Sequence, residues 1–474
     1  MAFLPELVLL AGALGLFVVT LGESQGKRAR AGALFVALVA LAASIVSLGQ
    51  SAVLFSGAYR VDAFSQWLKV VFSGGYVLIL LLSTSLPDIR NGIKAEYYLF
   101  LNLSVFGLTM LVSSVEVLSL VIALELSSFP LYLMVAMRRE REGQHVQMES
   151  AIKYVMFGVA ANGIMFFGFS YLFGLTGTTH LPELFTRLAP IADQPLAIVG
   201  LSMAFGGFFY KLAIFPFHFW TPDVYQGASN ETAGYIASLP KVGAVAVLVR
   251  LVSLATPENT TIATLLSVLA ILSMCYGNLI ALVQTDFKRL LGFSGIAHAG
   301  YAVVGFTALG TAGFTASLYY IVGYLLMVTA CFVVICRVSK DGTNVAIEDL
   351  AGLHRRSPLL AVTLIVAVFG LAGIPPFAGF IGKFGLLTAA LDKGHLALVI
   401  ITVVNTAVAI YYYLQVVRKG VFGEQPGEAG VIALDWPTRA LCVLLVVGIV
   451  WLGVAPGPIM NAISSSLAGI NLPL

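Results

Sequence analysis

Long apolar segments alternate with short polar connections along the whole chain. Each segment is close to the roughly 20 apolar residues with which an α-helix crosses a bilayer. The apolar runs are continuous rather than alternating with a period of two, so the strands of a membrane β-barrel are excluded. The pattern predicts an all-α polytopic membrane protein with about fourteen membrane-spanning helices. These expected helices cover residues 3–21, 31–49, 63–84, 97–113, 115–136, 150–176, 196–217, 230–253, 261–284, 290–309, 313–336, 358–390, 396–417 and 438–462.

Basic residues are distributed unequally over the connections between these segments. Seventeen Lys and Arg residues fall in the odd-numbered connections and three in the even-numbered ones. Basic residues concentrate in the cytoplasmic connections of membrane proteins. We therefore expect both termini to lie on the outer, periplasmic side of a bacterial cytoplasmic (inner) membrane. The first residues, Met1 to Glu6, lack the basic region of a signal peptide, so the first segment is expected to be retained.

Composition narrows the class further. Hydrophobic residues make up 59% of the chain and charged residues 10%, against about 25% charged residues in a soluble domain. These proportions exclude a soluble domain, a disordered chain and a disulfide scaffold, and the net charge of +3 is too small to suggest nucleic-acid binding. The four cysteines are scattered, with no CxxC pair, and no nucleotide-binding glycine motif is present. We expect no redox, metal or nucleotide cofactor on this chain.

Four charged residues lie well inside the apolar segments: Glu125, Lys211, Lys241 and Lys383. A charge at the bilayer centre costs about 2.5–3.5 kcal/mol on insertion scales, so pairing or internal water must offset it. An ion pair that only holds helices together needs one lysine for one acid. Three lysines over a single acid, spread over three segments, instead favour a proton relay.

Other charged positions have simpler explanations. Lys153, Arg250 and Glu116 lie near segment ends, where long side chains reach the membrane interface. Lys69 follows Asp62 by seven residues and is a candidate partner for it. His298 is the only histidine deep within an uninterrupted segment, and both a hydrogen-bonded core residue and a relay group fit it.

Helix-breaking residues gather beside the buried lysines. Gly206, Gly207 and Pro216 flank Lys211, and proline removes a backbone hydrogen bond from a helix. Unwound backbone is tolerated in a membrane only where protein or a water-filled cavity satisfies it. The sequence therefore predicts broken helices at the seventh and twelfth segments. The candidate helix-break or gating residues are Pro216, His218, Pro240, Pro375 and Pro376, with His218 either structural or gating.

The spacing of these features suggests an internal repeat. Glu125 precedes Lys211 by 86 residues, and His298 precedes Lys383 by 85. An Ala-x-x-Tyr-x-x-x-Gly pattern also occurs at both 151–158 and 316–323. Segments 4–8 and 9–13 then form two five-helix units, inverted because each contains an odd number of spans. The expected division is an N-terminal three-helix segment (1–96), a first repeat (97–255), a second, inverted repeat (256–420) and a C-terminal helix (421–474).

Three stretches carry a resemblance to a known family. The chain resembles the antiporter-like membrane subunits of respiratory complex I, the proton-pumping NADH:quinone oxidoreductase. That family also includes subunits of cation/proton antiporters. Among the large antiporter-like subunits of complex I, the chain most resembles the N-type. It ends soon after the fourteenth segment, and it has Lys383 where M-type subunits usually carry glutamate. Its Ala228-Ser-Asn-Glu231-Thr stretch departs from the proline-containing pattern that is common in N-type subunits. The stretches are Pro216-Phe-His-Phe-Trp-Thr-Pro-Asp-Val-Tyr225, Leu282-Val-Gln-Thr-Asp-Phe-Lys-Arg-Leu-Leu-Gly-Phe-Ser294 with Ile296-Ala-His298, and Gly373-Ile-Pro-Pro-Phe-Ala-Gly-Phe-Ile-Gly-Lys-Phe384.

The resemblance implies a proton-translocating subunit of a translocase-class NADH:quinone oxidoreductase, driven by redox chemistry in other subunits. FMN, iron–sulfur clusters and quinone are then expected in those partner subunits. The expected partners are further membrane subunits, through them the peripheral redox arm, and membrane lipid. Two alternatives remain open: a component of a Na⁺/H⁺ antiporter, and a membrane scaffold whose charges only join helices. The proton-transfer residues that the resemblance implies are Glu125, paired with Lys211, then Lys241, His298 and Lys383.

Overall fold

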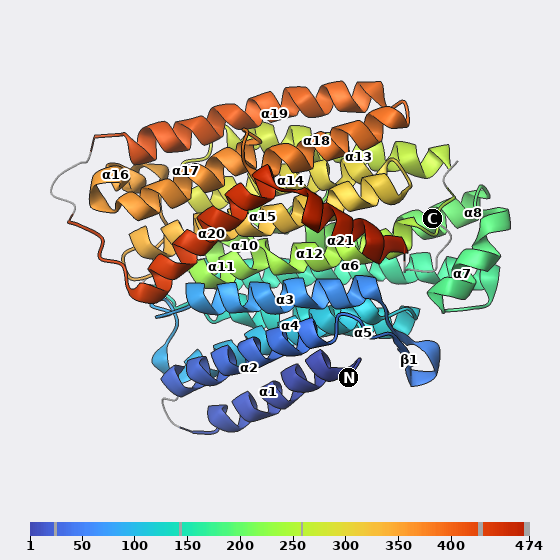
Figure 1. The fold of residues 1–474 in the computed structure, drawn as a ribbon, viewed down its shortest axis with the longest axis horizontal. Coiled ribbons are helices and arrows are strands. Elements are labelled where there is room, and N and C mark those ends of the chain that lie inside the picture. The colour runs from blue at the N-terminus through green and yellow to red at the C-terminus, as the bar shows by residue number, and fades with distance from the viewer. Residues whose placement is uncertain (23–25, 142–144, 257–258, 425–429, 469–474) are drawn as a thin grey trace.

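The computed structural model describes residues 1–22, 26–141, 145–256, 259–424 and 430–468 and shows a bundle of roughly aligned helices (Figure 1). The first half contains α1 (Leu4–Thr20), α2 (Gly26–Val46), β1 (Ala52–Leu54), β2 (Tyr59–Val61), α3 (Ala63–Leu82), α4 (Lys94–Ser113), α5 (Val117–Ala136), α6 (Val146–Thr176), α7 (Leu181–Leu188), α8 (Pro195–Ala204), α9 (Gly206–Leu212), α10 (Trp220–Gly227), α11 (Asn230–Ala237) and α12 (Leu239–Val252). The second half contains α13 (Thr260–Ala281), α14 (Phe287–Phe306), α15 (Thr311–Val338), α16 (Leu353–Arg356), α17 (Pro358–Ala372), α18 (Ala378–Asp392), α19 (Leu396–Val416), α20 (Trp436–Val454) and α21 (Gly457–Ala468).

Polar residues at the segment boundaries fix where several helices begin. A side-chain oxygen just before a helix can accept a hydrogen bond from one of the free amide groups of its first turn. Glu116 does so from Ser119, which explains a charge that the sequence placed at a segment end. The other side chains that cap helices in this way are Asp62, Ser229, Asn259 and Asp286.

The predicted membrane helices are confirmed in outline. Eleven helices within the described ranges are long and apolar enough to span a membrane. The three remaining predicted segments correspond to α1, α14 and the pair α17 and α18. The structure also differs from the prediction. The seventh segment resumes as α10 beyond its predicted end, the eighth is divided into α11 and α12, and the last is divided into α20 and α21. An unpredicted hairpin of β1 and β2 precedes α3, and the short helices α7 and α16 lie in predicted connections.

The connections sort into two groups at opposite ends of the bundle. Arg138, between α5 and α6, donates hydrogen bonds to Asp88, to the Gln226 carbonyl and to Asn344. Asp88 lies in the connection before α4, Gln226 at the end of α10 in the predicted seventh connection, and Asn344 in the connection after α15, so four odd-numbered connections meet at one end. At the other end, a backbone bridge joins Glu116 to His180 across two even-numbered connections. This grouping agrees with the alternation that the charge pattern predicts.

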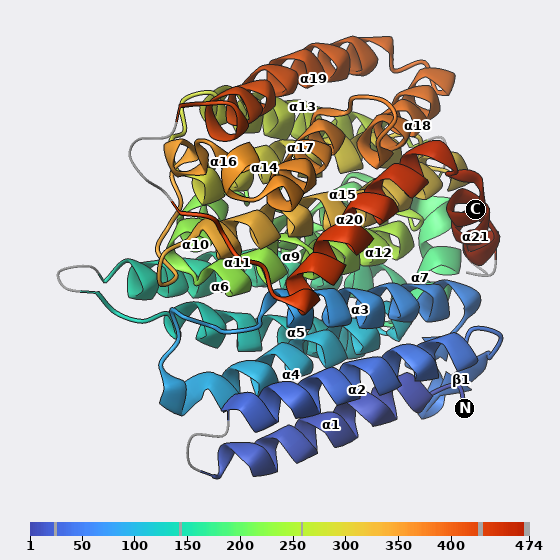
Figure 2. The same ribbon diagram turned by 60° about the vertical axis from the view of Figure 1, so that its left-hand side comes forward.

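The most deeply buried helices lie in the middle of the bundle. In both views α1 and α2 form one edge and α19 lies at the opposite side, with α12, α14 and α15 between them (Figures 1 and 2). Residues along α11 and α12 are buried throughout. The chain therefore places its eighth and tenth segments in the interior of the bundle, whereas the seventh exposes Leu196 and Val199 on α8.

Two buried ion pairs join distant segments, and both correct the sequence analysis. Lys69 pairs with Glu6 at 2.6 Å rather than with Asp62. Asp62 instead pairs with Arg250 at 2.8 Å, and Arg250 is buried rather than extended toward the interface. Burial alone raises the pKa of the Asp62 carboxyl, but the Arg250 charge and the hydrogen bonds from Ser65 hold that pKa below its ordinary value. The pair thus ties the start of α3 to α12.

Replacement of Arg250 by methionine leaves the buried Asp62 carboxylate without its counter-charge. Removing one partner of a buried ion pair costs about 3–5 kcal/mol, whereas an exposed pair contributes about 0–1 kcal/mol. We expect Arg250→Met to lower the thermal unfolding midpoint of the purified protein clearly. The matched control, Arg187→Met, breaks a pair with Glu183 whose side chains are half exposed. Equal shifts for the two variants would contradict this interpretation.

Candidate functional site

Two membrane segments are interrupted at the positions that the sequence predicts. The helix α9 ends at Leu212, Ala213 adopts a left-handed conformation (φ 68°), and Pro216 lies in the irregular stretch before α10. Likewise α17 ends at Ala372, and Gly373 (φ 84°) begins the stretch that contains Pro375 and Pro376 before α18. The predicted broken helices 7 and 12 are therefore confirmed. A third interruption, at Ser238, separates α11 from α12 just before Pro240.

Both breaks place helix C-termini beside buried lysines. The last carbonyl groups of a helix have no intrahelical partner and carry the negative end of the helix dipole, which favours a nearby cation. Lys211 lies in the last turn of α9. Lys383 lies on α18, but its amino group turns back and donates to the Leu371 and Ala372 carbonyls at the end of α17, at 3.2 Å each. The second break thus supplies oxygen atoms to the buried ammonium group of Lys383.

Glu125 does not contact Lys211 directly, in contrast to the pairing that the resemblance implies. No ion pair within 4 Å joins the two in the described part of the chain; the Glu125 carboxylate instead accepts a hydrogen bond from the Asn162 amide on α6. Lys211 is buried, and no hydrogen-bond partner of its Nζ lies among the described residues. Asn162 lies beside the lysine helix, since a Cβ atom at Gly207 would lie 2.9 Å from its Oδ1. Asn162 therefore stands between the acid and the helix that carries the lysine.

Lys241 is held at the centre of the bundle. Its Nζ donates to the Gly295 carbonyl on α14 at 2.9 Å and lies 5.5 Å from the centre of the Tyr324 ring. A Cβ atom at Gly295 would come within 3.1 Å of both Lys241 Nζ and the Tyr324 hydroxyl. Glycine at this position therefore leaves the lysine room beside the helix backbone.

His298 lies between Lys241 and Lys383. Its Nδ1 and Nε2 are hydrogen-bonded to the hydroxyls of Tyr320 (2.6 Å) and Tyr413 (3.0 Å), with donor and acceptor set by the tautomer. The ring centre lies 5.0 Å from that of Tyr324, the ring beside Lys241. On the other side, the His298 ring centre lies 5.8 Å from the Tyr301 ring centre. Lys383 Nζ lies 4.5 Å from the same Tyr301 ring centre. Lys241, His298 and Lys383 are thus joined by a continuous group of tyrosines.

His218 has a different environment. Its ring packs against Phe215, Phe219 and Tyr276, with ring centres 4.3–5.3 Å apart. Neither ring nitrogen has a hydrogen-bond partner among the described residues. The geometry gives His218 a packing role in the break after α9.

Several residues of this site were missed by the sequence analysis. The sequence contains one signal for the tyrosines that surround His298: Tyr320 and Tyr324 are four residues apart and therefore share one face of α15. Lys288 was assigned to a connection because it lies two residues before the predicted tenth segment. The structure buries it within α14, where its Nζ donates to the Ala228 carbonyl at 2.9 Å. Glu231, three residues after Ala228, is also buried.

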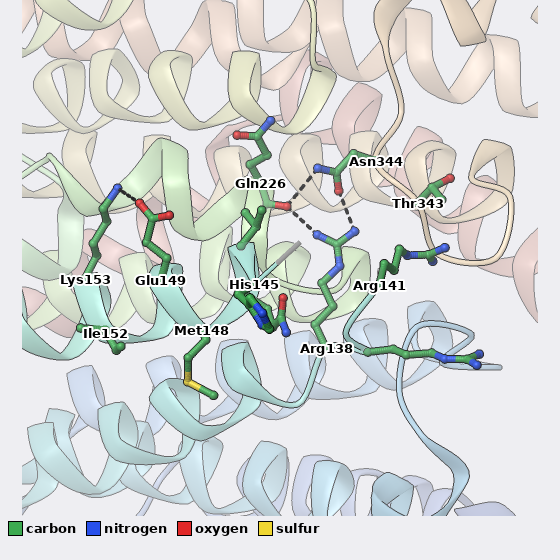
Figure 3. Close-up of a pocket in the computed structure, with 13 residues that line it drawn as sticks. Arg138, Arg141, His145, Met148, Glu149, Ile152, Lys153, Gln226, Thr343 and Asn344 are labelled. Carbon is green, nitrogen blue, oxygen red and sulfur yellow. Dashed lines mark hydrogen bonds and ion pairs between the residues drawn. The ribbon is translucent and has the colours of Figure 1, made fainter. Parts of the chain in front are cut away.

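A cavity of about 830 Å³ opens at the end of the bundle where the odd-numbered connections meet (Figure 3). Arg138 points to the Gln226 carbonyl and Asn344 on its inner side, and Lys153 pairs with Glu149 near its edge (Figure 3). None of the five predicted proton-transfer residues lines this cavity. Within the described ranges no group of three or more His, Cys, Asp or Glu residues is placed to hold a metal ion.

The chain matches a family model described as NADH:quinone oxidoreductase/Mrp antiporter, TM, over residues 114–409. It is 65% identical to NADH-quinone oxidoreductase subunit N 2 of Opitutus terrae, over 99% of this chain and 98% of that protein. It is 41% identical to the protein of the same name from Syntrophobacter fumaroxidans, over 98% of each chain. The chain belongs to the NADH:quinone oxidoreductase/Mrp antiporter family. The expected resemblance to antiporter-like subunits, and among them to the N-type, is confirmed.

Solved members of the family have the same fold. A chain of respiratory complex I from Thermus thermophilus, determined with bound aureothin, is 31% identical and covers 97% of this chain and 99% of that one, with a TM-score of 0.83. A chain of the Mrp complex from a Dietzia species is 19% identical, covers 98% and 97%, and has a TM-score of 0.88. At that identity the second likeness shows the fold alone. The antiporter-like fold is thus common to both assemblies, and the fold by itself does not identify the transported ion.

A substitution at Gly295 tests the central geometry of this antiporter-like subunit. Because a Cβ atom there meets Lys241 Nζ and the Tyr324 hydroxyl, we expect Gly295→Val to displace the lysine and to lower proton pumping at least tenfold. The measurement is acidification of inverted membrane vesicles during NADH oxidation. Gly163→Val is the matched control, since a Cβ atom at Gly163 meets nothing within 4 Å. Full pumping by an assembled Gly295→Val variant would contradict the placement of Lys241 in the pathway.

Proposed function

We propose that this chain is the N-type, proton-translocating subunit in the membrane arm of an NADH:quinone oxidoreductase. It moves protons through Glu125, Lys211, Lys241, His298 and Lys383, and the driving energy comes from redox chemistry in other subunits. The observation that carries the proposal is the buried series of Lys241, His298 and Lys383, joined by tyrosines and stabilised by backbone carbonyls rather than by carboxylates. Groups held in this way can change their charge without breaking an ion pair.

Electrostatic repulsion couples the groups of the series to one another. Two positive charges in an interior of low effective dielectric constant repel each other far more strongly than in water. A proton that arrives at Lys241 therefore favours loss of a proton from a neighbouring charged group, and His298 lies between Lys241 and Lys383 to relay it. Because these groups interact, they titrate as one coupled system rather than as independent sites. One end of the series exchanges protons with the cytoplasm and the other with the outside.

The coupling to a partner subunit enters through Glu125. This residue is only partly buried, and it lies on the face of α5 that also exposes Leu118, Ile122 and Phe129. These four residues are spaced three or four apart, so they form one stripe on the helix surface. A neighbouring membrane subunit that packs on this stripe can change the environment of Glu125. The effect reaches α9 and Lys211 through Asn162.

The division into two inverted repeats supports a pathway with two related halves. The helices α4 and α5 approach closely at Gly107, where a Cβ atom would lie 2.3 Å from the Ser127 nitrogen. The corresponding helices α13 and α14 do so at Gly277, 2.6 Å from the Ala297 nitrogen. We assign the repeats to residues 97–255 and 256–420, with additional segments at 1–96 and 421–474. Residues 425–429 and 469–474 of the last segment lie outside the described part.

We place the subunit in the bacterial cytoplasmic membrane with both termini on the outer side. The meeting of the basic, odd-numbered connections at one end of the bundle supports this orientation. FMN, iron–sulfur clusters and quinone belong to partner subunits in this proposal, and this chain carries protons only.

Substitution of Lys211 tests the function directly. Lys211→Ala removes the proton-carrying group beside the first break, so we expect assembled complex with proton pumping reduced to background. Assembly is followed on native gels and pumping by dye quenching in inverted vesicles. Lys393→Ala, at an exposed lysine, is the control and should pump normally. Normal pumping by an assembled Lys211→Ala variant would sink the assignment.

The hydroxyl beside His298 gives a finer test. Tyr413→Phe keeps the ring but removes the hydrogen bond to Nε2, and one such bond contributes about 0.5–1.5 kcal/mol, or roughly two- to tenfold in rate. We expect NADH-driven pumping to slow by that factor. Tyr411→Phe, at an exposed tyrosine two residues earlier, should leave the rate unchanged. An unaltered rate in Tyr413→Phe would remove that hydroxyl from the pathway.

The scaffold alternative is less consistent with the geometry. If the charges only joined helices, Glu125 and Lys211 would form the joint, but the carboxylate is bonded to Asn162 instead. A scaffold would also tolerate Glu125→Gln combined with Lys211→Met. We expect that double variant to assemble and to fail to pump; pumping at the native rate would favour the scaffold.

A further inference from the structure

A second large cavity lies beside α2 and α4, far in sequence from the proposed pathway. Its volume is about 1030 Å³. Four basic side chains line it, from the first turns of the two helices: Lys27, Arg28, Arg30 and Lys94. Thr84, Ser85, Asn91 and Tyr98 complete the polar part of its wall, and none of its described lining residues is acidic.

The basic residues of this cavity, which we call the α2–α4 cavity, have no direct ion-pair partner within the described part of the chain. No ion pair there involves any of its four basic residues, whereas Arg138, Lys153, Arg250 and Arg289 each have one. The amino group of Lys94 donates to the Ser85 carbonyl at 2.8 Å, and the Nε of Arg30 is buried without a hydrogen-bond partner among the described residues. Four cations that face one space repel each other, and an anion between them relieves that repulsion.

The same face of α2 continues from this cavity as an apolar stripe. Lys27, Ala31 and Leu34 line the cavity and follow each other at helical spacing. One turn further along, the face exposes Phe35, Leu38 and Ile45. The helices α1 and α2 form an outer edge of the bundle (Figures 1 and 2), and α2 has the length and hydropathy of a membrane span. The basic cavity and the apolar stripe of α2 therefore adjoin each other along the helix, as the headgroup and acyl chains of a lipid do.

We propose that the α2–α4 cavity binds the phosphate headgroup of an anionic phospholipid, whose acyl chains lie along the exposed stripe of α2. Basic pockets between membrane helices on the cytoplasmic side are suited to such headgroups, and this cavity belongs to the end of the bundle that carries the basic connections. The lipid would bridge the first turns of α2 and α4 and thereby fix the N-terminal pair of helices to the bundle. A free phosphate ion would satisfy the charges but would not use the apolar stripe.

The test uses the intact complex in vesicles that contain phosphatidylcholine and a photoactivatable phosphatidylglycerol. After illumination, crosslinked peptides are mapped by mass spectrometry. We expect crosslinks on α2 and α4, and at least a tenfold loss of them in a variant with Lys27→Gln, Arg28→Gln and Arg30→Gln. The matched control carries Arg418→Gln, Lys419→Gln and Arg439→Gln, which removes the same charge from exposed positions elsewhere and should leave the crosslinks unchanged.

Lys94→Gln serves as a second variant in case the triple variant fails to assemble, and we expect it to reduce the crosslinks as well. Four results would overturn the proposal. One is equal labelling of native and variant complexes. Another is equal labelling by photoactivatable phosphatidylcholine, which lacks net charge. A third is full displacement of the lipid probe by millimolar inorganic phosphate, which would identify a site for free anions. The fourth is absence of label from α2 in the assembled complex, which would mean that a partner subunit covers the cavity.

Discussion

An ammonium group buried among apolar helices must find oxygen atoms to replace water, and this requirement shapes the centre of the protein. A regular helix offers few, because its carbonyl groups are already bonded within the helix and side chains cover them. The chain meets the requirement in two ways. It ends α17 inside the bundle, so that free carbonyl groups accept hydrogen bonds from Lys383. It also places Gly295 where the bare backbone of α14 can accept a hydrogen bond from Lys241.

The same requirement explains why carboxylates are rare at the pathway but common elsewhere. Where the fold needs rigid joints, it uses buried ion pairs: Asp62 with Arg250, Glu6 with Lys69, and Asp88 with Arg138. Such pairs resist a change of charge, because loss of one partner leaves the other buried and unpaired. At the pathway, backbone carbonyl oxygens accept hydrogen bonds from Lys241 and Lys383 and remain tolerable neighbours when the lysine is neutral. The rigid joints therefore rely on buried ion pairs, whereas the groups that change charge rely on neutral oxygen atoms.

Much of this arrangement was predictable from local sequence, and the remainder depended on contacts between distant segments. Proline and glycine act within their own helix, so the breaks beside Pro216 and Pro375 were visible, as were the membrane segments. The partners of Lys69 and Arg250 come from other segments, and no local pattern identifies them. Asn162 and Tyr413 were invisible for the same reason, since amides and tyrosines are ordinary in membrane helices. Lys288 was missed because the predicted start of the tenth segment lies three residues after the start of α14, which placed the lysine in a connection.

The central claim is that this chain carries protons for a complex that oxidises NADH. The most direct measurement is to purify the native complex through a tag on this chain, reconstitute it in vesicles with quinone, and follow acidification after addition of NADH in a sodium-free medium. The account predicts that NADH oxidation co-purifies with the chain and that acidification proceeds without sodium. Purification without NADH oxidation, or ion movement that requires sodium and no electron donor, would contradict it and point to a cation/proton antiporter.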